Sequence, residues 1–526
     1  MKQCVLGIAA AVLFGTPAAA QLPAPGAPRG VLRLEIGGDF ATASNQFLDG
    51  TSQPYRAQFS TPIIGTAFYP ELAPSQASIA SLSGISGYAL NVGQSRMQAQ
   101  VSAGVLRLGG TLGITSKLSL FGVVPIVKQQ VEVLYSYDST GANAGYNPAN
   151  PVFGTSAGSA SVASFLGAYQ GALDTLSARL GAGYYDATPA DKALAQATLA
   201  SGTAYLGGLD SLYLGSVAPG QTTPFVPLAT SAAGLAMSGA VAATQANLAA
   251  LQIPSFTQPL PLPTAALTES EYNQFMTLTA GPIAAAPFTT NSSFLLGDVE
   301  LGAVYTIIDR WNQPGHPGGL RLVGRALVRF PTGTQPLPND FVSNPTGGGQ
   351  TDLQATIVAD VGGGKFGARF EGSYTDQMSA TAIERVTLPS QPVPWKDRLA
   401  SVTRDGGNEF LLSASPYFQL APGFALVGVV RYWSRGADAV SYASGTGALP
   451  GVNASDLAVG TDASATVLGG GVSYAPTGKP GGRVPLDAFW LYESVVSASG
   501  GIVPKVGAIR MGVRWPVRLW GGVASP

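Results

Sequence analysis

The feature that most limits how this chain can fold is a hairpin pattern over residues 295–330. Its first arm, LLGDVELGAVYTIID, alternates apolar and polar side chains with the period of two that is typical of a β-strand. After the connection RWNQPGHPGG, the second arm LRLVGRALVRF places Arg321, Arg325 and Arg329 on one face and apolar side chains on the other. Three arginines opposite an apolar stripe suit a membrane barrel, whose apolar face meets lipid while its polar face lines a wet interior.

The same alternation recurs along the chain. It predicts about twelve strands, near residues 31–40, 96–114, 118–135, 295–309, 320–330, 352–361, 366–375, 409–418, 424–435, 464–474, 486–496 and 507–515. Short turns alternate with long loops between them, as in outer-membrane barrels. We therefore predict an all-β membrane barrel of antiparallel strands, with a large helical insertion in one extracellular loop.

Two local expectations follow from the first long loop and the strand after it. Residues 50–93 contain Pro and Ser throughout and predict a long irregular loop. In the strand after it, the apolar positions change parity near Gly104, which predicts a β-bulge with the outer half of the strand beyond the bilayer.

Residues 137–293 lack a strand pattern. They are rich in Ala and Gly and predict weakly amphipathic helices that cap the barrel or plug it. Between residues 138 and 291, seven acidic and two basic residues give a net charge of -5. The alternative is a poorly ordered low-complexity insertion. Residues 231–251 carry no charge, but they are too polar to predict a membrane helix.

The N-terminal segment of the chain predicts export. Residues 1–20 combine Lys2, a short apolar run and the motif Ala18-x-Ala20, as in a cleaved signal peptide. Residues 21–30 then form a periplasmic linker, residues 31–136 hold strands 1 to 3, residues 294–520 hold strands 4 to 12, and residues 521–526 form a tail. The only cysteine, Cys4, lies in the signal, so we expect no disulfide.

Several kinds of site are not expected. A formal charge of -1 gives no footprint for nucleic acid. The only histidine, His316, is in a turn of the predicted hairpin, so a catalytic barrel is not expected. The acidic residues are scattered without the spacing of metal ligands, and no cofactor is expected. The sequence GGGK at residues 362–365 joins two strands and lacks the Ser or Thr of a phosphate-binding loop.

Charged residues on the polar faces of the strands are the candidate site. An arginine on the lipid face would cost about 2–4 kcal/mol near the middle of the membrane, so these residues are assigned to the interior. The predicted lumen-lining set is Arg33, Glu35, Arg107, Asp298, Glu300, Arg321, Arg325, Arg329, Arg369, Glu371, Arg431, Arg510 and Arg514. Two interpretations stay open: these charges set solute preference at a constriction, or they only pair across strands and fill the interior.

The strand segments also resemble a known family. Residues 106–127, LRLGGTLGITSKLSLFGVVPIV, and the hairpin continued to LRLVGRALVRFPTGT resemble the outer-membrane channels named after the meta-cleavage pathway of phenol degradation, which are similar to long-chain fatty-acid transporters. The resemblance implies a monomeric barrel that passes small hydrophobic or aromatic molecules. The insertion at residues 137–293 departs from the pattern of this family.

Together these observations predict a non-enzymatic channel in a bacterial outer membrane. Its partners would be membrane lipid and a small hydrophobic or aromatic solute that crosses passively. The alternative function is a surface binding or adhesion protein, in which the barrel is an anchor and the insertion binds a partner.

Overall fold

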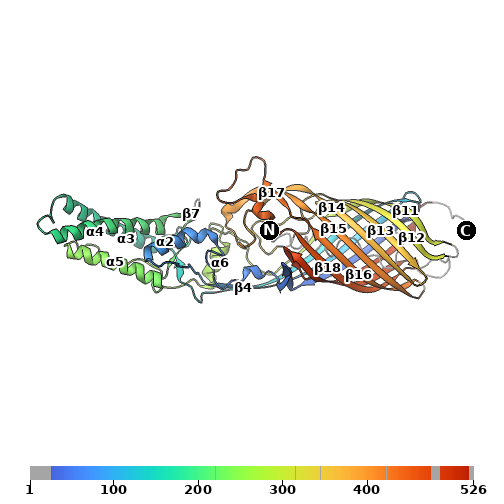
Figure 1. Cartoon of the computed structure of the whole chain (residues 1–526), viewed down its shortest axis with the longest axis horizontal. Helices are drawn as coiled ribbons and strands as arrows, with labels where there is room; N and C mark the ends of the chain where they lie inside the picture. Colours follow the sequence, from blue (N-terminus) through green and yellow to red (C-terminus); the bar gives the residue numbers. More distant parts are fainter. Residues whose placement is uncertain are drawn as a thin grey trace.

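The computed structural model describes residues 25–218, 221–313, 316–343, 345–421, 423–475 and 486–520. The predicted signal peptide and C-terminal tail lie outside these residues. A β-barrel forms one end of the molecule and a group of helices forms the other (Figure 1). We call the helical part the extension, the barrel end next to it the loop end, and the opposite barrel end the turn end.

The barrel is a closed antiparallel sheet. Its wall is formed by β1 (Val31–Ala43), β4 (Gln94–Gly113), β5 (Leu118–Asp138), β10 (Asn291–Leu296), β11 (Val299–Gln313), β12 (His316–Phe330), β13 (Asp352–Gly363), β14 (Phe366–Arg385), β15 (Leu399–Ala421), β16 (Phe424–Arg435), β18 (Ala463–Tyr474), β19 (Asp487–Gly500) and β21 (Gly507–Arg518). β10 and β11 both pair with β5 and form one interrupted wall strand, so the described residues give twelve wall strands. The predicted fold class is confirmed.

Closure joins the first and last parts of the chain. β1 pairs with β21 on one side and with β4 on the other, so Leu34 lies opposite both Trp515 and Gly110. Neighbouring strands are joined by short turns at the turn end and mostly by long connections at the loop end, as the predicted asymmetry required. Closure leaves no open sheet edge in the wall, which a bilayer would not tolerate.

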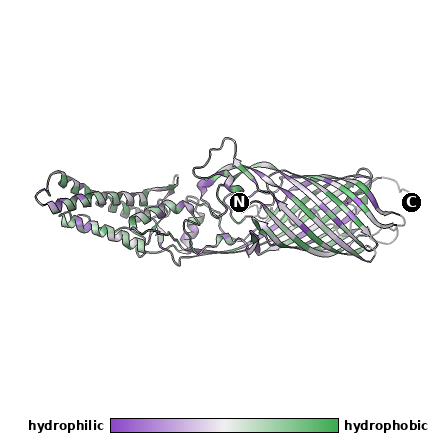
Figure 2. Ribbon diagram, in the orientation of Figure 1, coloured by the Kyte–Doolittle hydropathy of each residue, from purple (hydrophilic) through white to green (hydrophobic). Residues whose placement is uncertain are grey.

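The two faces of the wall differ as the alternation predicted. Figure 2 shows hydrophobic and hydrophilic residues side by side along the strands. On β12, Leu320, Ala326 and Phe330 are exposed on the outer face, whereas Arg321 is buried. The outer face of β1 likewise exposes Ile36 to 58%. An apolar outer face is what lipid requires.

The predicted bulge at Gly104 is wrong. The pairing of β4 with β1 and with β5 runs without a register shift through this residue. The parity of the apolar positions changes because the surroundings change. In the loop-end half, Gln98 and Gln100 are exposed on the outer face and Val101 is buried inside, whereas Leu106 and Leu108 are exposed on the outer face nearer the turn end. The loop-end half therefore has a polar outer face and an apolar inner one.

The first long loop is more regular than predicted. It holds β2 (Asn45–Leu48), β3 (Thr51–Pro54), two 3-10 turns at Ala57–Phe59 and Pro70–Leu72, and helix α2 (Ala73–Ser83). β2 pairs with β3 and with β20 (Ile502–Pro504), which lies in the last connection. The first and last long connections are thus held together at the loop end.

The extension contains most of the predicted insertion. Its helices are α3 (Ser156–Gly181), α4 (Pro189–Leu214), α5 (Ala232–Ala250) and α6 (Glu269–Thr277), and α2 packs with them. They project away from the loop end instead of filling the barrel (Figure 1). No helix among the described residues is both long and apolar enough to cross a membrane.

Local signals in the sequence explain where these helices begin. The side chains of Thr155 and Ser231 accept hydrogen bonds from the backbone of Gly158 and Gly234 at the starts of α3 and α5. Thr268 and Glu271 form a capping box at the start of α6. Ala favours the helix between such caps because it loses little entropy.

The extension has one continuous buried core. Within the described chain this core draws on residues 59–92, 144–285, 341–342 and 393–395, which belong to four different connections of the barrel. Tyr272 is central: its hydroxyl is 2.8 Å from that of Tyr69 and 3.1 Å from that of Tyr135, and its ring stacks on Tyr137. The extension is therefore built jointly by several loops.

Candidate functional site

The charged residues on the inner faces of the strands form ion pairs across the wall. Asp39 on β1 contacts Arg107 on β4 and Arg510 on β21, the latter at 3.1 Å. Glu493 on β19 contacts Arg510 at 3.4 Å and Arg431 on β16 at 3.0 Å. We call these five residues the Asp39–Glu493 network. Arg431 and Glu493 are not on adjacent strands, so this network spans part of the barrel interior.

Other predicted residues pair in the same way. Asp360 is 2.5 Å from Arg369 and 3.6 Å from Arg321, with both arginines directly opposite it on the flanking strands. Opposite charges at facing positions stabilise an antiparallel pair. The register of the barrel therefore matches these charges to each other.

Glu300 and Asp352 hold two further arginines. Glu300 is 3.1 Å from Arg329 and 3.9 Å from Arg325, and Arg329 is also 2.8 Å from Asp352. The guanidinium of Arg325 also lies over the ring of Phe121. With Arg514, which pairs with Glu35, eight of the nine predicted arginines have a carboxylate within ion-pair distance.

The remaining predicted residues lie as follows. Glu35 is 2.8 Å from Arg514, and the half-buried Arg33 has Arg514 as well as Asp487 and Glu35 as charged neighbours. Glu371 is half-buried on β14. Asp298 lies between β10 and β11, where it accepts a hydrogen bond from the backbone of Gly333 at 2.8 Å and so holds the β12–β13 connection against the wall.

Sequence reasoning missed Glu493. It is fully buried, and it shares two arginines of the predicted set. A signal for it exists: Trp490 and Tyr492 are exposed on the outer face, so the alternation of β19 places Glu493 inside. It is also the only acidic residue between Asp487 and the end of that strand.

An apolar layer lies on the loop-end side of the charges. Wall residues Val101, Val131 and Trp433 are buried there together with Phe47 and Val503 from the connecting strands β2 and β20. We call this cluster the apolar layer. These hydrophobic side chains are of the kind that disfavours water and hydrated ions.

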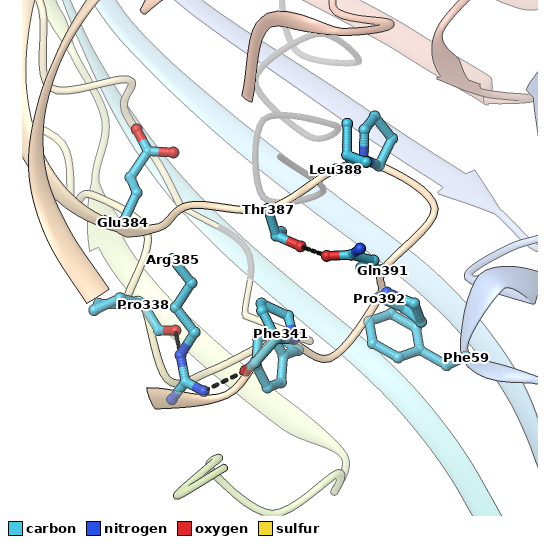
Figure 3. Close-up of a pocket in the computed structure, with 11 residues that line it drawn as sticks. Phe59, Pro338, Phe341, Glu384, Arg385, Thr387, Leu388, Gln391 and Pro392 are labelled. Atoms are coloured by element: carbon cyan, nitrogen blue, oxygen red, sulfur yellow. Dashed lines mark hydrogen bonds between the residues drawn. The ribbon is translucent and has the colours of Figure 1, made fainter. Parts of the chain in front are cut away.

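A pocket lies at the loop end, between three of the long connections (Figure 3). Its empty volume is about 520 Å³, part of it open to solvent. Phe59, Phe341 and Leu388 give it apolar walls, together with the prolines Pro338, Pro389, Pro392 and Pro394. We call it the mouth pocket. Apolar walls with a few polar groups are typical of sites for small molecules.

The polar groups of the mouth pocket are held by their neighbours. Glu384 makes a two-point ion pair with Arg404, at 2.6 and 3.0 Å. The Thr387 hydroxyl donates to the Gln391 side-chain oxygen at 2.6 Å. The fourth group, Arg385, donates from Nε to the Pro338 carbonyl at 2.9 Å and from Nη1 to the Pro394 carbonyl at 2.7 Å.

Arg385 is a buried cation. Arg385 is 5% exposed as a whole residue, and its guanidinium lies 5.0 Å from the centre of the Phe341 ring. Burial lowers the pKa of Arg385 to about 10, although the charge of Asp397 opposes the change. It therefore stays charged at neutral pH.

Within the described ranges, no group of three or more His, Cys, Asp or Glu residues could hold a metal ion. His316 is the first residue of β12, and its backbone pairs with Gln313 at the turn end. These observations leave the interior and the mouth pocket as the candidate site.

The closed wall, the apolar outer face and the paired interior define the class of protein: a transmembrane β-barrel of the outer-membrane type. No protein-family model and no curated protein matches the chain. Solved structures do. An outer membrane channel from Pseudomonas putida F1 matches with a TM-score of 0.40 and 9% identity, over 94% of this chain and 99% of that one.

Two other matches show the range of barrels that are similar. The toluene transporter TbuX from Ralstonia pickettii matches with a TM-score of 0.29 and 8% identity, over 98% of both chains. The transport unit of the autotransporter AIDA-I from Escherichia coli matches with a TM-score of 0.33 and 5% identity, over 98% of this chain and 97% of that one. Two monoaromatic hydrocarbon channels also match, with TM-scores of 0.25 and 0.28, and they are of the kind that the strand segments resemble.

Proposed function

We propose that this protein is an outer-membrane channel for the passive passage of small hydrophobic or aromatic solutes. The proposal includes export by residues 1–20, with the mature barrel acting as a monomer. The solute would meet the mouth pocket first, then the apolar layer, and then the paired charges of the interior.

The observation that carries this proposal is the apolar layer. Val101, Val131 and Trp433 are each at most 5% exposed and lie at the mouth of the barrel. A hydrated ion or sugar would lose water there without gaining hydrogen bonds, whereas an apolar solute loses nothing by the transfer. The arginines of the interior do not argue for charge selection, because carboxylates pair with most of them.

Solute flux tests the proposal. Liposomes that carry lipopolysaccharide in the outer leaflet would be loaded with the full-length mature protein, and influx of indole would be compared with influx of glucuronate. Protein-free liposomes are needed because small aromatic molecules cross lipid unaided. We expect the protein to raise indole influx only. Glucuronate influx above the protein-free rate would indicate an open polar pore and contradict the proposal.

A matched pair of variants locates the path. Val101→Asn places an amide in the apolar layer, while Gln98→Asn changes an exposed residue on the outer face of the same strand. We expect indole influx to fall in the first variant and to stay unchanged in the second. Equal influx in both variants would mean that solute does not cross the apolar layer.

A second candidate function rests on the extension. It has a buried core of its own and projects away from the barrel, as a binding domain on an anchor would (Figure 1). In that case the protein would give no indole influx above the protein-free rate, and the binding partner would be sought on the extension.

A further inference from the structure

The mouth pocket contains a cation, Arg385, that has no ion-pair partner among the described residues, although the charge of Asp397 acts on it. Among the described residues, no carboxylate oxygen lies within 4.0 Å of the Arg385 guanidinium. Both carboxylate oxygens of the neighbouring Glu384 accept hydrogen bonds from Arg404. An arginine has five N–H donors, and the carbonyls of Pro338 and Pro394 take two of those on Arg385.

The surroundings make this arrangement unfavourable without a ligand. The residue is 5% exposed, and a buried charge needs a counter-charge as well as hydrogen bonds. The ring of Phe341 offers only partial compensation through its π face. The remaining donors of a guanidinium form a planar fork that matches the two oxygens of a carboxylate.

We propose that the mouth pocket binds small carboxylates with an apolar or aromatic body, with the carboxylate on the unused N–H donors of Arg385 and the body against Phe59, Phe341 and Leu388. This inference rests on the proposed function, because it narrows the solutes that would use the channel. It adds a negatively charged head to the apolar body that the channel would favour.

Arg385 is distinct from the arginines of the interior. Eight of the nine interior arginines have a carboxylate within ion-pair distance, and several of these partners lie directly opposite on a neighbouring strand. Arg385 is the last residue of β14, at the loop end. There it lines a pocket that is partly open to solvent.

Binding to the purified full-length protein in detergent tests the proposal without requiring flux. Isothermal titration would compare benzoate with benzamide, which has nearly the same shape but no charge, and with acetate, which has the charge but no apolar body. We expect benzoate to bind about tenfold or more tightly than either, as for a charge-assisted fork. Equal binding of benzoate and benzamide would overturn the proposal. Acetate binding as tightly as benzoate would refute the claim that the apolar body contributes to binding.

Variants place the site. Arg385→Gln should weaken benzoate binding about tenfold and change indole binding less than about twofold. Arg96→Gln, on the exposed outer face of β4, should change neither. Benzoate binding that survives Arg385→Gln would place the anion elsewhere and refute the assignment.

A folding failure of Arg385→Gln would still leave a decisive variant. Leu388 is 40% exposed on the pocket wall, so Leu388→Trp fills the pocket without disturbing a buried contact. It should abolish benzoate binding, and unchanged binding would refute the site. If benzoate binds in this way but indole influx is absent, the channel proposal fails while the pocket assignment stands. If indole influx is observed but benzoate does not bind, the pocket assignment fails while the channel proposal stands.

Discussion

Removing the charge of Glu493 should destabilise the barrel strongly. The Asp39–Glu493 network holds three arginines and two carboxylates, so Glu493→Gln raises its excess from one to two positive charges. The side chains of Glu493, Arg431 and Arg510 are 0%, 2% and 2% exposed, so water does not screen the change. Breaking a buried pair by removing one partner typically costs about 3–5 kcal/mol.

The free energy of unfolding should be measured in urea, with the folded fraction read from heat-modifiable migration on gels. We expect Glu493→Gln to lower it by about 3–5 kcal/mol. Glu132→Gln is the matched control, since Glu132 is exposed on the outer face of β5 and should change stability by less than about 0.5 kcal/mol.

A double variant separates charge from packing. Replacing Arg431 and Glu493 together, as Arg431→Met with Glu493→Leu, removes both charges and keeps the volume. It should cost less than Glu493→Gln alone, because well-packed apolar residues can replace a buried pair at little cost. A single variant within about 1 kcal/mol of the wild type, or a double variant as unstable as the single, would refute this electrostatic account.

Two further predictions concern the lipid face and the loop end. Ile36→Arg puts a charge on a position that is 58% exposed on the outer face. It should lower the free energy of unfolding in a bilayer by about 2–4 kcal/mol, the cost of an arginine near mid-membrane, while Ile36→Leu should not. Burial raises the pKa of Glu71 above its usual 4.5 despite the 3.3 Å pair with Arg398, so the folded state binds this proton more tightly than the unfolded state. Stability from this group is present below pH 4.5 and is lost as pH rises through the folded pKa. Thermal melts of Glu71→Gln should lack that fall, and parallel pH profiles of the variant and the wild type would contradict it.

The strand pattern was sufficient to predict the wall, because the period of two and the lipid requirement act on each strand separately. It failed at Gly104, where apolar parity was taken to report backbone register. The register is continuous there, and the exposed side chains of the outer face change from polar to apolar. A sequence pattern alone does not distinguish these two causes.

The candidate site was predicted less completely, for a related reason. The arginines of the interior could be assigned a face, but their partners depend on which strands are neighbours and at what register. Glu493 was missed for this reason, although the exposed Trp490 and Tyr492 indicate its face. The mouth pocket could not be predicted at all, since Phe59, Phe341 and Leu388 come from three connections that only the closed barrel brings together.

The shared core of the extension has a consequence for how the protein is made. Tyr69 and Tyr272 meet across 203 residues of sequence, and Phe341 and Trp395 join the same core from still later connections. Long-range contacts of this kind form late, after the loops that bring them together have closed. The helices can form early, but the complete core also needs Phe341 and Trp395, which lie in the connections after β12 and β14. A completed extension would then mark a barrel that has finished assembly, and protease resistance of the extension could serve as a readout of that step in pulse-chase experiments.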